Sequence, residues 1–113
     1  MKKKILATTM AVVLGITALT GCGNSGKDNY TIGISQFAVH GSLDNCREGF
    51  LAGLAEEGFV EGENLNIEYV NAQAEPGTAA MTTDNFVTKK VDMICAIATP
   101  TAMTAYNSTM NTE

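Results

Sequence analysis

The stretch Val91-Asp92-Met93-Ile94-Cys95-Ala96-Ile97-Ala98 decides the fold, because it is apolar at nearly every position. A strand with one wet face alternates apolar and polar residues, whereas a strand covered on both faces is apolar almost throughout. Such strands are typical of parallel sheets that carry helices on both sides. The stretch therefore predicts an α/β fold.

The segments next to this strand have the spacing of helices. Pro76 suits a first helical turn, and a weakly amphipathic helix follows it as far as Lys89 and Lys90. After the strand, Thr99-Pro100-Thr101 opens another helix, which includes Met103 and Met110. Thr99 is a candidate N-cap for that helix. We expect the methionines of these segments to be packing residues; they are Met81, Met93, Met103 and Met110.

Two further βα units complete the pattern toward the N-terminus. Residues 30–34 form a short strand, and a helix follows from its candidate N-cap, Ser42, to Gly58. Residues 64–70 alternate apolar and polar side chains, which indicates a strand at the edge of the sheet. Because each connection allows a right-handed crossover, the three units predict a parallel sheet of order 2-1-3, the beginning of a doubly wound fold.

Three parallel strands make a small sheet with two open edges. The 92 residues from Cys22 to Glu113 suffice for one small domain or for part of a larger one. We therefore expect residues 30–113 to be a partial N-terminal α/β lobe, with the rest of that lobe and a second lobe absent.

The first residues have the pattern of an export signal. Lys2, Lys3 and Lys4 precede an apolar run over residues 5–19, and Leu19-Thr20-Gly21-Cys22 resembles the box of bacterial lipoproteins. We predict a signal peptide over residues 1–21, a lipidated Cys22 and a flexible tether over residues 22–29. The protein is then extracytoplasmic and anchored to the cell membrane.

Charge and cysteine content exclude several kinds of partner and site. The residues after the predicted leader include four basic and twelve acidic ones. The resulting net charge of −8 argues against nucleic acid as a partner. Cys46 falls on the apolar face of the first helix and Cys95 in the middle of the last strand. We expect both thiols to be buried and free, although a single disulfide between them is the alternative. The cysteine and histidine spacing indicates no metal site, and no cofactor is expected.

The candidate ligand site lies where the three strands end. In an open α/β sheet, ligands bind beyond the carboxyl ends of the strands, where the strand order reverses. The loops there carry neutral polar groups, one aromatic ring and one imidazole, which suit recognition better than catalysis. The candidate residues are Gln36, Phe37, His40, Asn71, Gln73, Thr99 and Thr101. Each also has a structural alternative: the amides can satisfy loop backbone, Thr99 and His40 can cap helices, and Phe37 can belong to the core.

Several segments together resemble the substrate-binding lipoproteins of the TrpX-like ABC transporters. The resemblance runs from about residue 30 to the end and includes the lipoprotein leader. It is carried by Tyr30-Thr31-Ile32-Gly33-Ile34, Arg47-Glu48-Gly49-Phe50, Gly58-Phe59-Val60-Glu61-Gly62, Asn71-Ala72-Gln73 and Ala96-Ile97-Ala98-Thr99-Pro100. Gly41 departs from a common proline and Met103 from a common glutamine.

This resemblance implies the first part of a two-lobed periplasmic-binding-protein-like fold that closes on a small solute, in several members an aromatic amino acid. The expected function is capture of a solute for delivery to ABC permease subunits in the membrane, with no enzyme activity and a monomeric complete protein. Two alternatives remain: a surface-anchored flavodoxin-like enzyme, which needs a catalytic cluster, and an extracellular ligand-binding sensory domain, which needs a transmembrane segment.

Overall fold

Strands and helices alternate along residues 28–112, the part of the chain that the computed structural model describes. The predicted signal peptide (residues 1–21) and residues 22–27 of the predicted tether, with Cys22, lie outside this part. The elements are β1 (Tyr30–Gln36), α1 (Gly41–Glu56), β2 (Leu65–Asn71), α2 (Pro76–Thr88), β3 (Met93–Ile97) and α3 (Thr99–Thr109). Within residues 28–112, no helix has both the length and the apolar character needed to cross a membrane.

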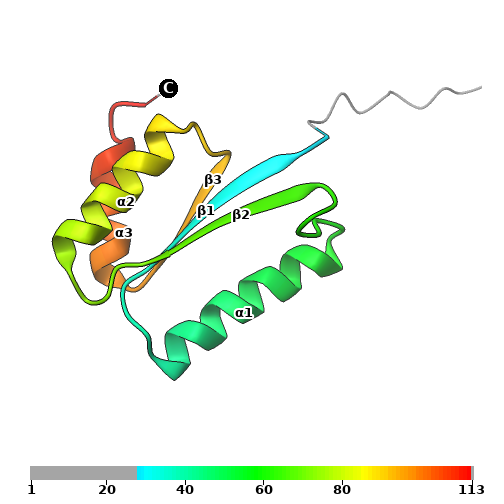
Figure 1. The fold of residues 1–113 in the computed structure, drawn as a ribbon, viewed down its shortest axis with the longest axis horizontal. Helices are drawn as coiled ribbons and strands as arrows, with labels where there is room; N and C mark the ends of the chain where they lie inside the picture. The colour runs from blue at the N-terminus through cyan, green and yellow to red at the C-terminus, as the bar shows by residue number, and fades with distance from the viewer. Residues whose placement is uncertain (1–27, 113) are drawn as a thin grey trace, which may run out of the picture.

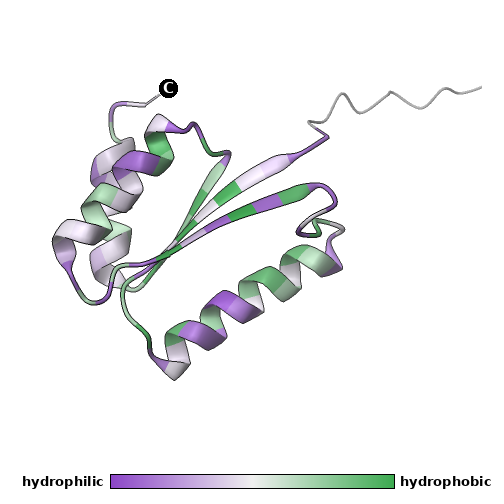
Figure 2. Cartoon of the chain, in the orientation of Figure 1, coloured by the Kyte–Doolittle hydropathy of each residue, from purple (hydrophilic) through white to green (hydrophobic). Residues whose placement is uncertain are grey.

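The three strands form one parallel sheet in the order β2-β1-β3, which confirms the predicted order. Helix α1 covers one face of the sheet, and α2 and α3 lie side by side on the other (Figure 1). Helices therefore cover both faces of the sheet, and this explains why β3 is apolar at nearly every position. The alternation in β2 matches its place at an edge of the sheet and is visible as alternating colours in Figure 2.

The core on the α1 side consists of branched aliphatic residues from all three strands. Ile32 of β1 pairs in register with Ile67 of β2, and Ile34 of β1 pairs with Cys95 of β3. Directly paired residues share a face of the sheet, so these four side chains point toward α1. From the helix, residues that are partly buried pack against them, namely Leu43, Phe50, Leu51 and Leu54.

The other face is built around a contact between a glycine and an aromatic ring. Phe86 of α2 is buried, and a Cβ atom added to Gly33 of β1 would lie 2.5 Å from its Cδ2 atom. A side chain at position 33 would therefore collide with the ring. The glycine lets α2 approach the centre of the sheet closely.

The boundaries of the elements differ from the predicted ones by one to a few residues; β3, for example, spans Met93–Ile97 and is shorter than the predicted strand over residues 91–98. Strand β1 extends to Gln36, which was expected in the following loop, because the register with Asn71 continues to that residue. Helix α1 begins at Gly41, and its N-cap is His40 instead of Ser42. Helix α3 begins at Thr99, so Ala98 and not Thr99 is its N-cap.

Two expectations about burial are wrong. Cys46 is exposed, because α1 turns Leu43, Phe50 and Leu54 toward the sheet and leaves Cys46 at the border of that face. Cys95 is partly buried, and both thiols are free. The four methionines of the described elements are also exposed, since they lie on surfaces that the described elements do not cover; they are Met81, Met93, Met103 and Met110.

Candidate functional site

The carboxyl ends of the three strands bring three connections to one edge of the sheet. These are residues 37–40 after β1, residues 72–75 after β2, and Ala98 between β3 and α3. Strand β1 is central, and the chain leaves it first toward β2 and then crosses back to β3. The edge is therefore the switch point at which open α/β sheets bind ligands.

Gln36 lies at this edge but is fully buried, and its amide is used inside the protein. Its Nε2 donates to the carbonyl of Ala38 and to Oδ1 of Asp44, at 2.8 Å each. Its Oε1 accepts from Nη1 of Arg47 at 3.0 Å. The same guanidinium lies 4.5 Å from the centre of the Tyr69 ring. Gln36 thus joins β1 to α1. This agrees with the alternative interpretation of Gln36 as a structural residue that satisfies loop backbone.

The loop after β2 is held by Asn71. Its Oδ1 accepts from the backbone N–H of Gln73 at 2.8 Å, and its Nδ2 donates to the hydroxyl of Tyr69 at 3.3 Å. Gln73 is exposed and has a φ of 54°, and the next residue, Ala74, has a φ of 61°. Both residues are in the left-handed region, which places the Gln73 side chain in solvent at the edge of the sheet.

The third connection contains a more strained residue. Ala98 has a φ of 87° and a ψ of 154°, a conformation that is almost confined to glycine. Of the four non-glycine residues with positive φ in residues 28–112, Gln73, Ala74 and Ala98 lie at this edge. Strain of this kind collects at ligand sites, where the surrounding structure holds it.

The two threonines of this connection have different surroundings. Thr99 is exposed at the first position of α3. Thr101 is fully buried, and its hydroxyl donates to the carbonyls of Ile97 at 2.7 Å and Ala98 at 2.8 Å. The structure therefore presents Thr99 at the surface and uses Thr101 to hold the start of the helix.

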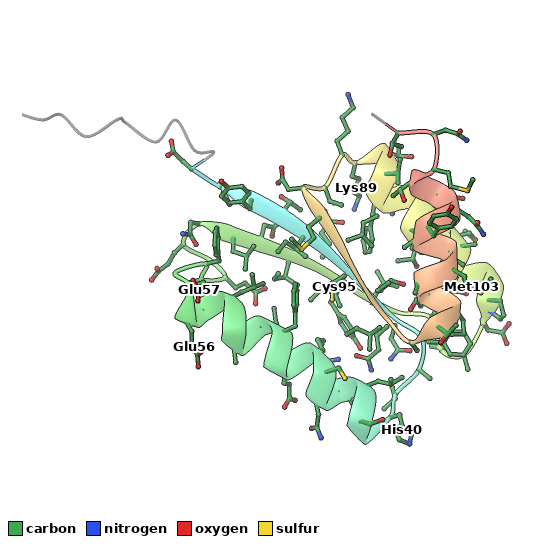
Figure 3. The ribbon with its side chains drawn as sticks, turned by 180° about the vertical axis from the view of Figure 1, so that it is seen from behind. His40, Glu56, Glu57, Lys89, Cys95 and Met103 are labelled. Carbon is green, nitrogen blue, oxygen red and sulfur yellow. The ribbon has the colours of Figure 1, made fainter. Side chains whose placement is uncertain are left out.

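The helix N-termini at the edge differ in their caps. His40 caps α1: its Nδ1 accepts from the backbone N–H of Ser42 at 3.2 Å and lies 2.8 Å from the Ser42 hydroxyl. Figure 3 shows His40 at the very start of that helix. Helices α2 and α3 have no side-chain cap, and both carry proline in the first turn. Backbone N–H groups at the starts of α2 and α3 thus lack side-chain acceptors, and a helix start favours an anion.

The loop after β1 is fixed at almost every residue except Val39. Phe37, which is half-buried, donates its N–H to Ile97 at 3.2 Å and accepts from Ala74 at 2.7 Å. Val39 is 80% exposed, the largest exposed fraction among the large apolar residues of the described chain. Nothing in the sequence marks Val39, because a valine three residues after a strand gives no signal of exposure.

Two hollows lie along the outer side of β3 and α3. The one of about 770 Å³ is at the amino end of β3 and is lined by residues that include Val91, Asp92 and Tyr106. The other, of about 380 Å³, borders the strand-end edge and is lined by residues that include Ala98, Thr99 and Met103. Although the first is larger, the second adjoins the uncapped start of α3. Chemistry therefore favours the smaller hollow as part of a ligand site.

The described residues offer little for catalysis. No group of three or more His, Cys, Asp or Glu side chains that could hold a metal gathers within residues 28–112. Burial raises the pKa of the Cys95 thiol, and the nearby Cys46 raises it further. A raised pKa keeps Cys95 protonated and weakly nucleophilic. The edge is equipped to bind a small polar molecule through backbone and neutral side chains.

Known proteins resemble this chain in sequence and in structure. The model of a family described as ABC transporter substrate binding protein matches residues 31–112. A tyrosine-binding protein of Clostridioides difficile is 39% identical over 120 residues, which cover 95% of this chain and 35% of that protein. The chain thus spans about a third of the length of this relative.

Solved structures show the same arrangement. A ligand-free, open structure of a substrate binding protein with adhesive properties from Clostridium difficile has a TM-score of 0.69 at 40% identity, covering 70% of this chain and 27% of that one. An ABC domain in complex with L-Trp from Streptococcus pneumonia has a TM-score of 0.67 at 32% identity, covering 71% and 27%. A conserved domain protein from Vibrio cholerae has a TM-score of 0.70 at 36% identity, with the same coverage of 71% and 27%.

Proposed function

The chain belongs to the family of ABC transporter substrate binding proteins, and from this membership we propose that it supplies one wall of an amino-acid cleft. The complete protein would be a solute-binding lipoprotein of an ABC importer, which captures an aromatic amino acid between two lobes. The observation that carries the proposal is the strand-end edge, where strained backbone and two uncapped helix starts lie together. One relative is a tyrosine-binding protein and another was solved in complex with L-Trp, which supports the choice of solute.

The polar end of the ligand would lie at the start of α3. Thr99 and the backbone N–H groups after Pro100 suit a carboxylate, because the helix dipole favours an anion there. Asn71, Gln73 and Phe37 remain proposed as contacts on the same edge, and His40 lies next to it at the start of α1. Gln36 and Thr101 would support the site without touching the ligand. Both are buried, and their hydrogen bonds hold the elements that carry the edge.

A chimera tests this function directly. Residues 30–112 replace the matching segment of the tyrosine-binding protein of Clostridioides difficile, which is 39% identical over 120 aligned residues. We expect calorimetry to show binding of tyrosine or another aromatic amino acid, and no binding of dipeptides or sugars. A folded chimera that binds none of the twenty amino acids would contradict the proposal.

The membrane anchor is a separate proposal. Cys22 would take the diacylglyceryl group after export, and the residues up to Asn29 would tether the lobe near the permease subunits. Cys22→Ala should release the protein from membranes or leave it unprocessed, whereas Cys46→Ala should not. Mass spectrometry that finds an unmodified Cys22 at the mature N-terminus would overturn the anchor and leave the binding proposal intact.

We propose in addition that the complete protein is monomeric, extracytoplasmic and free of cofactors and enzyme activity. Solute capture needs only the closing of two lobes on the ligand. The acidic balance of the chain beyond its leader, four basic residues against twelve acidic, supports partners other than nucleic acid.

A further inference from the structure

The loop between β1 and α1 holds an apolar side chain out into solvent. Val39 is 80% exposed, and both of its neighbours are fixed by hydrogen bonds. The carbonyl of Ala38 accepts from the buried Gln36 amide at 2.8 Å, and the carbonyl of His40 accepts from the N–H of Asp44 at 2.9 Å. The loop therefore does not depend on the Val39 side chain for its shape.

The position of this loop indicates what the exposed side chain of Val39 can contact. It follows the central strand at the switch point, and its Phe37 is bonded to Ile97 at the end of β3 and to Ala74 in the loop after β2. The start of α3, with the exposed Thr99, follows Ile97 after the single residue Ala98. An anion-favouring helix start and a fixed apolar side chain thus belong to one edge. A ligand that matches both has a carboxylate at one end and an apolar group at the other.

We propose that Val39 is a specificity-determining residue that contacts the apolar side chain of the bound amino acid. This inference rests on the proposed function and adds the residue that selects for an apolar, in particular an aromatic, side chain. Because the loop is already fixed, little order is lost when the ligand covers Val39. Neighbouring Phe37 is half-buried and would support the same contact from the core side.

The test measures binding to the chimera described above. Val39→Ser should weaken the affinity for L-tyrosine about tenfold or more, since losing apolar contact in a pocket has an effect of that size. Val39→Ile should bind within about threefold of the unchanged chimera. The melting temperature of the ligand-free protein should not change, because the side chain is exposed. Met81→Ser is the matched control: Met81 is 74% exposed but lies in the middle of α2.

The choice of ligand separates the possible contacts of Val39. The loss on Val39→Ser should be much smaller for L-alanine than for L-tyrosine. Equal losses would mean that Val39 touches the second lobe, and would overturn the inference. An unchanged affinity for L-tyrosine would also overturn it and leave the proposed function standing. If the unchanged chimera binds no amino acid, the proposed function fails and this inference fails with it.

A second measurement needs no substitution. In the unchanged chimera, the methyl signals of Val39 should shift in NMR spectra more on addition of L-tyrosine than on addition of L-alanine. Shifts confined to other valines, such as Val60 or Val87, would contradict the assignment.

Discussion

Gly33 and Phe86 form the contact at which a single methyl group should have the largest effect. A Cβ atom at position 33 would lie 2.5 Å from the ring of Phe86, which is 1% exposed and has no room to move away. We expect Gly33→Ala to lower the free energy of unfolding by about 1–3 kcal/mol, the usual cost of overpacking a core. Urea unfolding of the chain measures this change.

Gly49→Ala is the matched control for that variant. Gly49 lies within α1, and an added Cβ there meets nothing within 4 Å. Alanine is the better helix former by about 1 kcal/mol, so this variant should be neutral or more stable. Equal stability of Gly33→Ala and Gly49→Ala would show that α2 does not approach β1 as closely as described.

Cys95 gives the fold a dependence on alkaline pH. Burial, with a smaller effect of Cys46, raises the pKa of the Cys95 thiol in the folded state. As the pH rises, the unfolded chain loses this proton first, so the free energy of unfolding falls from about pH 8.5 upward. Below that range both states hold the proton and the contribution is fully present. Cys95→Ala should reduce the alkaline slope of stability against pH; an unchanged slope would mean that the thiol is freely hydrated.

At the scale of elements, α1 depends on a polar network as well as on apolar contacts. The helix has no fully buried residue, and Arg47 joins it to Gln36 of β1 and to the ring of Tyr69 on β2. Arg47→Ala removes a charged hydrogen bond and a cation–π contact. It should lower the free energy of unfolding by about 1–3 kcal/mol.

The neighbouring Glu48 supplies the control for Arg47. It is exposed on the same helix, so Glu48→Ala should change stability by less than about 0.5 kcal/mol. Arg47→Lys should restore only part of the loss, since lysine lacks the planar guanidinium. Full stability of Arg47→Ala would mean that the apolar contacts of Leu43, Phe50 and Leu54 hold α1 alone.

The order of elements was predictable from the sequence, whereas the surroundings of single side chains were not. An apolar β3, an alternating β2 and helix-length connections specify a parallel sheet through chirality and burial. The burial of Gln36 depends on Asp44 and Arg47, which are eight and eleven residues away. Local sequence does not encode such a contact.

The sequence predicted which loops meet at one edge of the sheet, but not how the side chains of those loops are used. The topology brings the three strand ends to one edge, as the fold rule requires. Thr99 and Thr101 look equivalent in the sequence, yet the helix turns one outward and the other toward the carbonyls of Ile97 and Ala98. The left-handed conformations of Gln73, Ala74 and Ala98 have no glycine to signal them.

At the scale of the whole molecule, the described residues form a platform, and we propose one of its edges as the ligand wall. The opposite edge, at the amino end of β3, has the larger hollow but lacks helix N-termini. The chain matches about a third of the length of the tyrosine-binding relative. In the proposal, its edge is one wall of a cleft that a second lobe completes. The start of α3 is therefore the place where loss of a single hydroxyl should weaken the binding of the ligand.

The affinity of the Thr99→Val chimera for L-tyrosine tests this central claim most directly. Thr99 is exposed at the first position of α3, so valine should leave the melting temperature of the ligand-free protein unchanged. Losing one hydrogen bond to a charged group costs about 1.5–3 kcal/mol, or roughly ten- to a hundredfold in affinity. Thr88→Val, at the far end of α2, is the control and should bind as the unchanged chimera does. Calorimetry that finds Thr99→Val weaker by this factor supports the strand-end edge as the ligand wall, and equal affinity of the two variants would contradict it.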